Sequence, residues 1–301
     1  MPASGPLDAG CAWIDGEYVP VHEAKIPLLE TGFVRSDATY DVVAVWRGRF
    51  FLLEDHLDRL ERSCELIRLT PPISRSRMTE IMNAVVARSG LRDAYVEAIV
   101  TRGVPSAGER DPRRFQPRFY AFAIPYVWIA CPDVADVGTD VVIARDTRRI
   151  PPGSIDPRVK NFQWGDFIRG LFEAYDRDAL LPILTDAEGD VAEGPGFNVF
   201  ALVDGELRTP DRGVLEGITR LTVLDIAREL GIRTRVARLP ARDLARAHEI
   251  LLSSTAGGVM PVARLDGAPV GDGRPGPITT RIRDTYWAWH EDPRFATPIR
   301  Y

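Results

Sequence analysis

A change of hydrophobic period within residues 40–69 constrains the fold of this chain more than any other feature. Residues 40–53, YDVVAVWRGRFFLL, contain two β-prone runs around Gly48, a pattern typical of a β-hairpin. Residues 54–69, EDHLDRLERSCELIRL, then place apolar side chains at spacings of three and four, which predicts an amphipathic helix. A hairpin followed directly by such a helix predicts a mixed α+β unit.

Residues 1–124 repeat this combination and predict a small N-terminal α/β domain. Asp15-Gly16, between two short β-prone runs, is a further hairpin signal. Ser74 is a candidate N-cap for a second helix, which Gly90 would end. The other expected elements of this domain are a helix over residues 75–90 and strands over residues 94–103 and 118–127.

Residues 125–138 predict a linker, because they contain Pro125 and Pro132 and show no clear period. The remaining chain, residues 139–301, predicts a larger C-terminal domain. Its expected strands cover residues 139–146, 179–186, 196–205, 206–210 and 249–258, and its expected helices cover residues 164–177, 217–231 and 279–290.

The charge and cysteine content narrow the class of protein. A net charge of −5 argues against binding to nucleic acid or to an anionic membrane surface. No apolar run approaches the roughly 20 residues that span a bilayer, and no signal peptide is visible at the N-terminus. Cys11, Cys64 and Cys131 lack metal-ligand spacing and predict free thiols. We expect a cytoplasmic protein without a metal site.

Lysine is scarce in this chain. Of its 38 lysine and arginine residues only two are lysines, Lys25 and Lys160, and the other 36 are arginines. Arginine carries surface charge equally well, but its guanidinium stays protonated and is a poor nucleophile, whereas a lysine amine can condense with an aldehyde. Lys160 is therefore a candidate nucleophile, with a surface charge as the alternative.

Four further stretches could contribute to a site, although each also has an ordinary structural explanation. Glu193 precedes Gly-Pro-Gly and could point into a cleft or simply lie in a loop. Residues 217–219 begin a strong helix, whose free N–H groups attract anions. Residues 253–258, SSTAGG, suit either a phosphate or a tight turn. Arg59 lies beside the apolar stripe of its helix and would need an anionic partner if buried.

Taken in order, these stretches resemble the fold-type IV pyridoxal-phosphate enzymes, which include branched-chain and D-amino-acid transaminases and aminodeoxychorismate lyase. The resemblance runs from about residue 11 to residue 290. It is strongest toward the (R)-selective amine transaminases, through IPLLETGFVRSDATYDVVAVWRGRFF, RRIPPGSIDPRVKNFQWGD, EGPGFNVF and TAGGVMP. It implies a small N-terminal domain, a larger C-terminal pseudo-barrel domain, and a homodimer with active sites at the subunit interface.

The resemblance also implies pyridoxal 5'-phosphate as the cofactor and gives each candidate a role. Lys160 matches the Schiff-base lysine, which also moves the proton between substrate and cofactor. Glu193 matches the acid that keeps the pyridine nitrogen protonated. Arg59, Ile218, Thr219 and Thr255 match the phosphate-binding residues. The implied substrates are an apolar (R)-amine and a keto acid such as pyruvate, or the corresponding ketone.

The substrate pocket is where relatives differ. By resemblance, its lining comprises Arg35, Tyr40, Val42, Tyr95, Trp164, Leu215, Ser254 and Ala256. Arg110, in the Gly- and Pro-containing stretch GVPSAGERDPRR, is a candidate for a mobile arginine that binds the acceptor carboxylate, and Arg35 is its rival. Both positions depart from the close relatives, so acceptor preference stays open.

Three other functions stay open on the sequence. A branched-chain or D-amino-acid aminotransferase would use the same lysine and glutamate with a carboxylate-binding pocket. An enzyme of the aminodeoxychorismate lyase type would release pyruvate without transferring an amino group. A cofactor-free binding protein would take up no pyridoxal phosphate.

Overall fold

The computed structural model describes residues 9–301 of the chain. Residues 1–8, which include most of the stretch inspected for a signal peptide and the start of the predicted N-terminal domain, lie outside the described residues. The described residues divide into two units: residues 9–127, 159–163 and 290–301 form the first, and residues 128–158 and 164–289 form the second. This division differs from the expected domains 1–124 and 139–301 with linker 125–138. Residues 159–163 and 290–301 lie with the first unit, and residues 128–138 lie with the second.

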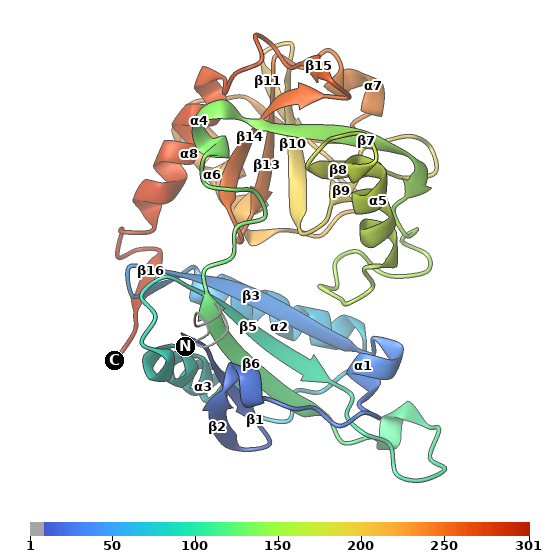
Figure 1. Ribbon diagram of the computed structural model, residues 1–301, viewed down its shortest axis with the longest axis vertical. Helices are drawn as coiled ribbons and strands as arrows, with labels where there is room; N and C mark the ends of the chain where they lie inside the picture. Colours follow the sequence, from blue (N-terminus) through green and yellow to red (C-terminus); the bar gives the residue numbers. More distant parts are fainter. Residues whose placement is uncertain (1–8) are drawn as a thin grey trace, which may run out of the picture. The chain divides into compact units, whose positions relative to one another are not determined.

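The first unit is built on a seven-stranded antiparallel sheet (Figure 1). The hairpin expected around Gly48 is confirmed, because β3 pairs with β4 through Val45–Phe50 and Trp46–Arg49. In spatial order the strands are β16 (Ala296–Pro298), β4 (Arg49–Phe51), β3 (Ala38–Trp46), β5 (Ala94–Thr101), β6 (Arg118–Pro125), β1 (Cys11–Ile14) and β2 (Glu17–Pro20).

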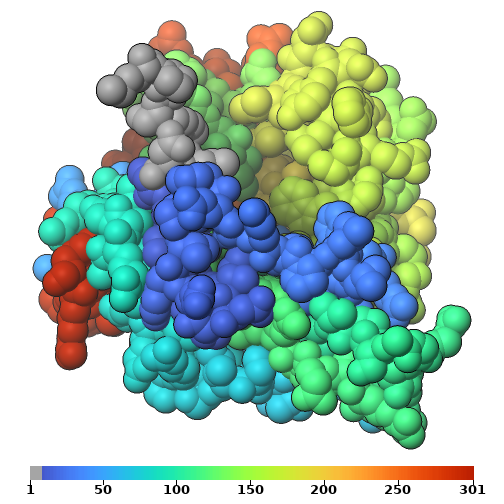
Figure 2. Space-filling view, turned by 60° about the horizontal axis from the view of Figure 1, so that its bottom comes forward, coloured from blue at the N-terminus to red at the C-terminus, as the bar shows by residue number. Residues whose placement is uncertain are grey.

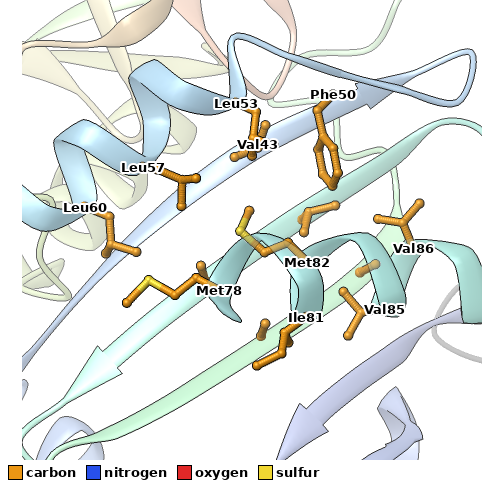
Figure 3. Packing of buried hydrophobic residues seen from close by; sticks show 14 of the residues in the cluster. Val43, Phe50, Leu53, Leu57, Leu60, Met78, Ile81, Met82, Val85 and Val86 are labelled. Carbon is orange, nitrogen blue, oxygen red and sulfur yellow. The ribbon is translucent and has the colours of Figure 1, made fainter. Parts of the chain in front are cut away.

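Two helices cover one face of this sheet, α2 (Leu53–Leu66) and α3 (Arg75–Ser89). Figure 3 shows Val43 of the sheet beside Leu53 of α2, in one cluster with Phe50 and with Met82 of α3. Ser74 caps α3 as expected, because its Oγ accepts a hydrogen bond from the N–H of Arg77. The short helices of this unit are η2 (Val21–Glu23), α1 (Thr31–Arg35) and η3 (Pro112–Arg114).

Because side chains alternate along a strand, the residues on the other face of this sheet, which α2 and α3 do not cover, can be identified. Val43 faces the helices, so its neighbours Tyr40, Val42 and Ala44 lie on the other face. The register pairs Val42 with Glu97 and Ala44 with Tyr95, which places Glu97 and Tyr95 on that face too. This second face carries several of the residues expected to line the substrate pocket.

The second unit is built on a nine-stranded mixed sheet. The main order is β12 (Thr234–Val236), β11 (Glu206–Thr209), β10 (Phe197–Val203), β13 (Glu249–Ser254), β14 (Gly258–Leu265), β7 (Thr139–Arg148) and β8 (Leu181–Thr185), with β9 (Glu193–Gly194) on β10 and β15 (Ala268–Pro269) on β14. The helices are α4 (Val134–Val137), α5 (Gly165–Tyr175), α6 (Ile218–Glu229), α7 (Ala241–Leu244) and α8 (Pro277–Trp289).

Helix packing closes the core of the second unit. Helix α5 packs on β7 and β8, whereas α6 and α8 pack on β13 and β14. Leu252, Met260 and Val262 are among the buried side chains of this core. The strand expected over residues 249–258 ends at Ser254, because a turn over residues 255–257 reverses the chain into β14. Helix α4 and β12 were not expected from the sequence.

The loop of residues 102–117, between β5 and β6, projects from the first unit (Figures 1 and 2). Within residues 9–301, no helix combines the length and apolar character needed to cross a bilayer. Over the same residues, no group of His, Cys, Asp and Glu side chains is placed to hold a metal ion.

Candidate active site

Lys160 lies in residues 159–163, a short segment that belongs to the first unit although the chain on either side of it belongs to the second. Its carbonyl accepts hydrogen bonds from the N–H of Tyr40 at 3.1 Å and the hydroxyl of Thr39 at 2.8 Å. Its N–H donates to the hydroxyl of Ser63 in α2 at 3.3 Å. These bonds fix its backbone on β3, and its side chain is half-buried. Lys25, by contrast, is exposed.

The amine of Lys160 lies over the second face of the first sheet. Its Nζ is 4.4 Å from the centroid of the Tyr40 ring, and the ring of Phe162 stacks on Tyr40 at 4.3 Å. Val42 and the half-buried Tyr95 share this face. Lys160 therefore lies beside one expected substrate residue, Tyr40, and two more, Val42 and Tyr95, lie on the same face of the sheet as Tyr40.

Arg59 lies on the other side of the same strand, in α2. The guanidinium is 3% exposed and donates two hydrogen bonds to Asp41, at 2.7 Å and 2.8 Å. His56 Nδ1 lies 2.7 Å from the same carboxylate. Burial by itself would raise the pKa of Asp41, but Arg59 and His56 outweigh it and hold that pKa well below its usual range. Asp41 is thus a buried anion that orients Arg59.

We expect Arg59→Ala and Asp41→Asn to affect cofactor retention differently. If Arg59 binds the phosphate, its loss removes a charge-assisted hydrogen bond of about 1.5–3 kcal/mol, so the cofactor should dissociate about 10- to 100-fold more readily. Asp41→Asn keeps the guanidinium and should retain the cofactor better, although both variants unfold at lower temperature because each breaks a buried ion pair.

For each variant we measure the fraction of cofactor retained after dialysis, by absorbance, and the unfolding temperature. Equal loss of cofactor in both variants would show that Arg59 serves only as the structural partner of Asp41.

In the second unit, Glu193 is held by a buried ion-pair chain. Glu193 begins β9 and is 5% exposed. Arg149 donates from Nε to Glu193 at 3.0 Å and from a terminal nitrogen to Asp166 at 2.6 Å. The guanidinium of Arg149 also lies 4.2 Å from the centroid of the Phe167 ring. Two carboxylates around one cation fix the orientation of the Glu193 side chain.

The other oxygen of Glu193 is held by the loop that leads into α6. Its Oε2 accepts hydrogen bonds from the N–H of Leu215 at 2.9 Å and the amide of Asn198 at 3.4 Å. Asn198 also donates to the Leu215 carbonyl at 2.9 Å. A Cβ on Gly217 would lie 2.1 Å from the side-chain oxygen of Asn198, so a larger residue there would displace the Asn198 amide. This network joins Glu193 to the start of α6.

The first turn of α6 carries the buried residues Ile218 and Thr219. Gly217 is the N-cap residue and provides no side-chain cap, and the first turn contains no acidic residue. Twelve residues give this helix a full dipole, so its first N–H groups favour an anion. These features fit a phosphate group.

The turn between β13 and β14 places three more of the expected residues. The hydroxyl of Ser254 donates to the Gly196 carbonyl at 2.7 Å and accepts from the N–H of Ala256 at 3.1 Å. Thr255 is half-buried between them. Trp164 is also half-buried, and its ring lies edge-on to Phe167.

The two candidate arginines for an acceptor carboxylate are both exposed. Arg35 is the last residue of α1, and Arg110 lies in the projecting loop 102–117. The Arg110 backbone N–H donates to Glu109. Among residues 9–301 we find no hydrogen bond or ion pair for either guanidinium. The structure therefore does not choose between them.

Sequence reasoning missed the groups that hold these side chains. Arg149, Asp166, Asn198 and Asp41 were assigned no role. Arg149 is one of 36 arginines, and it lies 44 residues from Glu193 in the chain, so no local spacing marks it. Asp41 carried a weak signal, because a charged residue inside the apolar run YDVVAVW implies a buried partner.

Solved structures with this architecture are fold-type IV aminotransferases. A branched-chain amino acid aminotransferase of T.th. with pyridoxamine 5'-phosphate superposes with a TM-score of 0.90 at 26% identity, covering 98% of this chain and 100% of that one. The branched-chain aminotransferase of Thermoproteus uzoniensis with norvaline gives a TM-score of 0.87 at 29% identity, covering 96% and 99%. The expected α+β fold-type IV class is confirmed.

Sequence comparison gives the family. The chain is 29% identical to the putative branched-chain-amino-acid aminotransferase of Methanocaldococcus jannaschii over 91% of this chain and 94% of that protein. It is also 29% identical to the branched-chain-amino-acid aminotransferase of Salmonella typhimurium, over 91% of each. The family model for amino-transferase class IV matches residues 38–265. The chain belongs to the class IV aminotransferases, and it is a pyridoxal-phosphate-dependent enzyme.

These named relatives are branched-chain aminotransferases, and not the (R)-selective amine transaminases that the sequence analysis favoured. The family and the cofactor are therefore established, and the donor remains to be assigned.

Proposed function

We propose that this enzyme transfers the amino group of an amino acid with an apolar, branched-chain type of side chain to a 2-oxo acid. The observation that carries this proposal is similarity to branched-chain aminotransferases along nearly the whole of both chains. Related T.th. structures contain 4-methylvaleric acid, an apolar branched acid, and N-(5'-phosphopyridoxyl)-L-glutamate. Both ligands suit a donor and acceptor of this kind.

When bound, pyridoxal phosphate supplies an aldehyde that exchanges amines and a ring that withdraws electrons. We propose that Lys160 binds the cofactor covalently and moves the proton at the donor carbon. Glu193, paired with the Arg149 guanidinium, keeps the ring nitrogen protonated. Arg59, Ile218, Thr219 and Thr255 bind the phosphate.

The (R)-selective amine transaminase activity is the second candidate. On β3 and β5, the face beside Lys160 presents Tyr40, Val42 and Tyr95, and its only charged residue is Glu97. These residues of β3 and β5 offer no cation to a donor carboxylate, which favours an uncharged apolar substituent beside them. An exposed arginine, Arg110 or Arg35, would then serve the acceptor carboxylate.

Donor turnover separates the two candidates. We expect the holoenzyme, with 2-oxoglutarate or pyruvate as acceptor, to use one enantiomer of leucine faster than either enantiomer of 1-phenylethylamine. Faster turnover of (R)-1-phenylethylamine would reject the branched-chain assignment in favour of the amine transaminase. Release of pyruvate from aminodeoxychorismate without amino transfer would instead identify a lyase.

We further propose that the enzyme is a homodimer with its active sites at the interface. In the first unit, five large apolar side chains between residues 26 and 34 are 46–74% exposed. In the second unit, Ile168, Phe172 and Tyr175 are exposed on one side of α5. Exposed apolar groups of this size are typical of surfaces that associate.

A further inference from the structure

Glu97 is a buried carboxyl that the proposed chemistry does not use. It lies in the middle of β5 and is 7% exposed. Within residues 9–301, we find one hydrogen bond for its side chain, accepted from the hydroxyl of Tyr95 at 3.1 Å. A carboxylate has about four acceptor sites, so most of the capacity of Glu97 is unused.

Glu97 lies on the face of the sheet that carries the reactive lysine. Its register partner on β3 is Val42, two residues from Tyr40, and the amine of Lys160 lies over the Tyr40 ring. Burial raises the pKa of Glu97 and outweighs the lowering by the Tyr95 hydroxyl and the nearby charge of Lys160, so that this pKa is about 7. Lys160 is therefore close enough to Glu97 for their charges to interact.

The first unit contains a second buried glutamate that is bonded to a tyrosine, Glu30 with Tyr120, and its surroundings differ from those of Glu97. The hydroxyl of Tyr120 donates to Glu30 at 2.9 Å, and Glu30 is 1% exposed. Arg118 also lies 4.0 Å from that carboxylate. Glu30 thus has a cation beside it as well as a tyrosine, whereas the cation near Glu97 is Lys160, the residue that the reaction engages.

We propose that Glu97, positioned by Tyr95, is a specificity-determining residue that accepts a hydrogen bond from an ammonium or hydroxyl group at the far end of the substrate. This inference rests on the proposed function, because it requires the substrate to react at Lys160. The enzyme then accepts amino donors whose far end is cationic or hydroxylated, in addition to apolar ones. It discriminates against donors that carry a carboxylate at that end, since two anions would be buried together.

Two donor series test this inference on the holoenzyme, each changing only the distal group. In the amino acid series these are norleucine, ornithine and glutamate. In the amine series they are pentylamine, 1,4-diaminobutane and 4-aminobutanoate, with 4-amino-1-butanol as the hydroxyl probe. We measure kcat/KM for each donor with pyruvate as acceptor, so the comparison is valid whichever donor class is correct.

In the parent enzyme, the cationic donor should exceed the carboxylate donor of its series by at least about tenfold. Glu97→Gln keeps the shape but removes the charge, and should lower the ratio of cationic to apolar donor by about 10- to 100-fold. Tyr95→Phe keeps the charge and should preserve the order of donors. Glu30→Gln is the matched control and should leave the ratio unchanged.

An unchanged ratio in Glu97→Gln, or the same change in Glu30→Gln, would overturn the inference. If Glu97→Gln does not fold, a parent enzyme that prefers the carboxylate donor in both series overturns the inference equally.

Failure of the proposed function would give a different result. An enzyme that uses ornithine or 1,4-diaminobutane but neither apolar donor supports the role of Glu97 and rejects the apolar donor assignment.

Discussion

Lys160→Ala is expected to abolish transamination and the absorbance band of the covalently bound cofactor. The physical reason is that the only other lysine is Lys25, and the 36 arginines carry guanidiniums, which stay protonated and do not form this bond. The carbonyl of Lys160 is already fixed by Tyr40 and Thr39, so the substitution should leave the backbone in place. Absorbance spectra and steady-state rates measure both effects.

Lys25→Arg is the matched control, because Lys25 is exposed and its replacement keeps the charge. It should leave the spectrum and the rate unchanged. Borohydride reduction followed by peptide mapping gives an independent measurement, and the phosphopyridoxyl label should appear on Lys160. A label on Lys25, or full activity of Lys160→Ala, would falsify the assignment.

Glu193→Gln should keep the cofactor bound but slow proton removal from the donor. A nearby carboxylate shifts the pKa of a cationic partner by about 1–3 units, so its loss should lower the single-turnover rate by about 10- to 1000-fold. The amide oxygen that replaces one carboxylate oxygen can still accept a hydrogen bond from Arg149 or from Leu215, but not from both, because these two groups donate to different oxygens of Glu193. Stopped-flow measurement of the first half-reaction gives the rate.

Glu249→Gln tests whether any buried acid of the second unit would have the same effect. Glu249 is 7% exposed and accepts hydrogen bonds from the N–H groups of Ile278 and Thr279 and from the Thr279 hydroxyl, at the start of α8. Its neutralisation should lower the unfolding temperature and leave the single-turnover rate near that of the parent. Equal rates for Glu193→Gln and the parent enzyme would reject the role of Glu193.

Secondary structure was predictable wherever the hydrophobic period was strong. The helix expected over residues 54–69 is α2 (Leu53–Leu66), and the one expected over 75–90 is α3 (Arg75–Ser89). Short pieces were missed because they depend on tertiary contacts. Residues 296–298 become a strand only by pairing with β4, and α4 lies in a stretch whose prolines suggested no regular structure.

The candidate site was predictable only in part, for a related reason. Lys160 is visible because lysine is rare, and Glu193 because it directly precedes Gly-Pro-Gly. The side chains that orient them are common types far away in the sequence. Asp41 is 18 residues from Arg59, and Asp166 is 17 from Arg149, so only the folded chain reveals the pairs. The roles of the expected site residues remain proposals for the experiments above.

The strand over residues 296–298 has a consequence for how the protein is made. It pairs with β4 at the edge of the first sheet, so that sheet is incomplete until this segment has been synthesised. At about 5–20 residues per second, a ribosome needs about 10–30 s to travel from residue 127 to residue 290. During that interval the nascent chain displays β4 with one edge unpaired, which is an opportunity for chaperones and for aggregation alike.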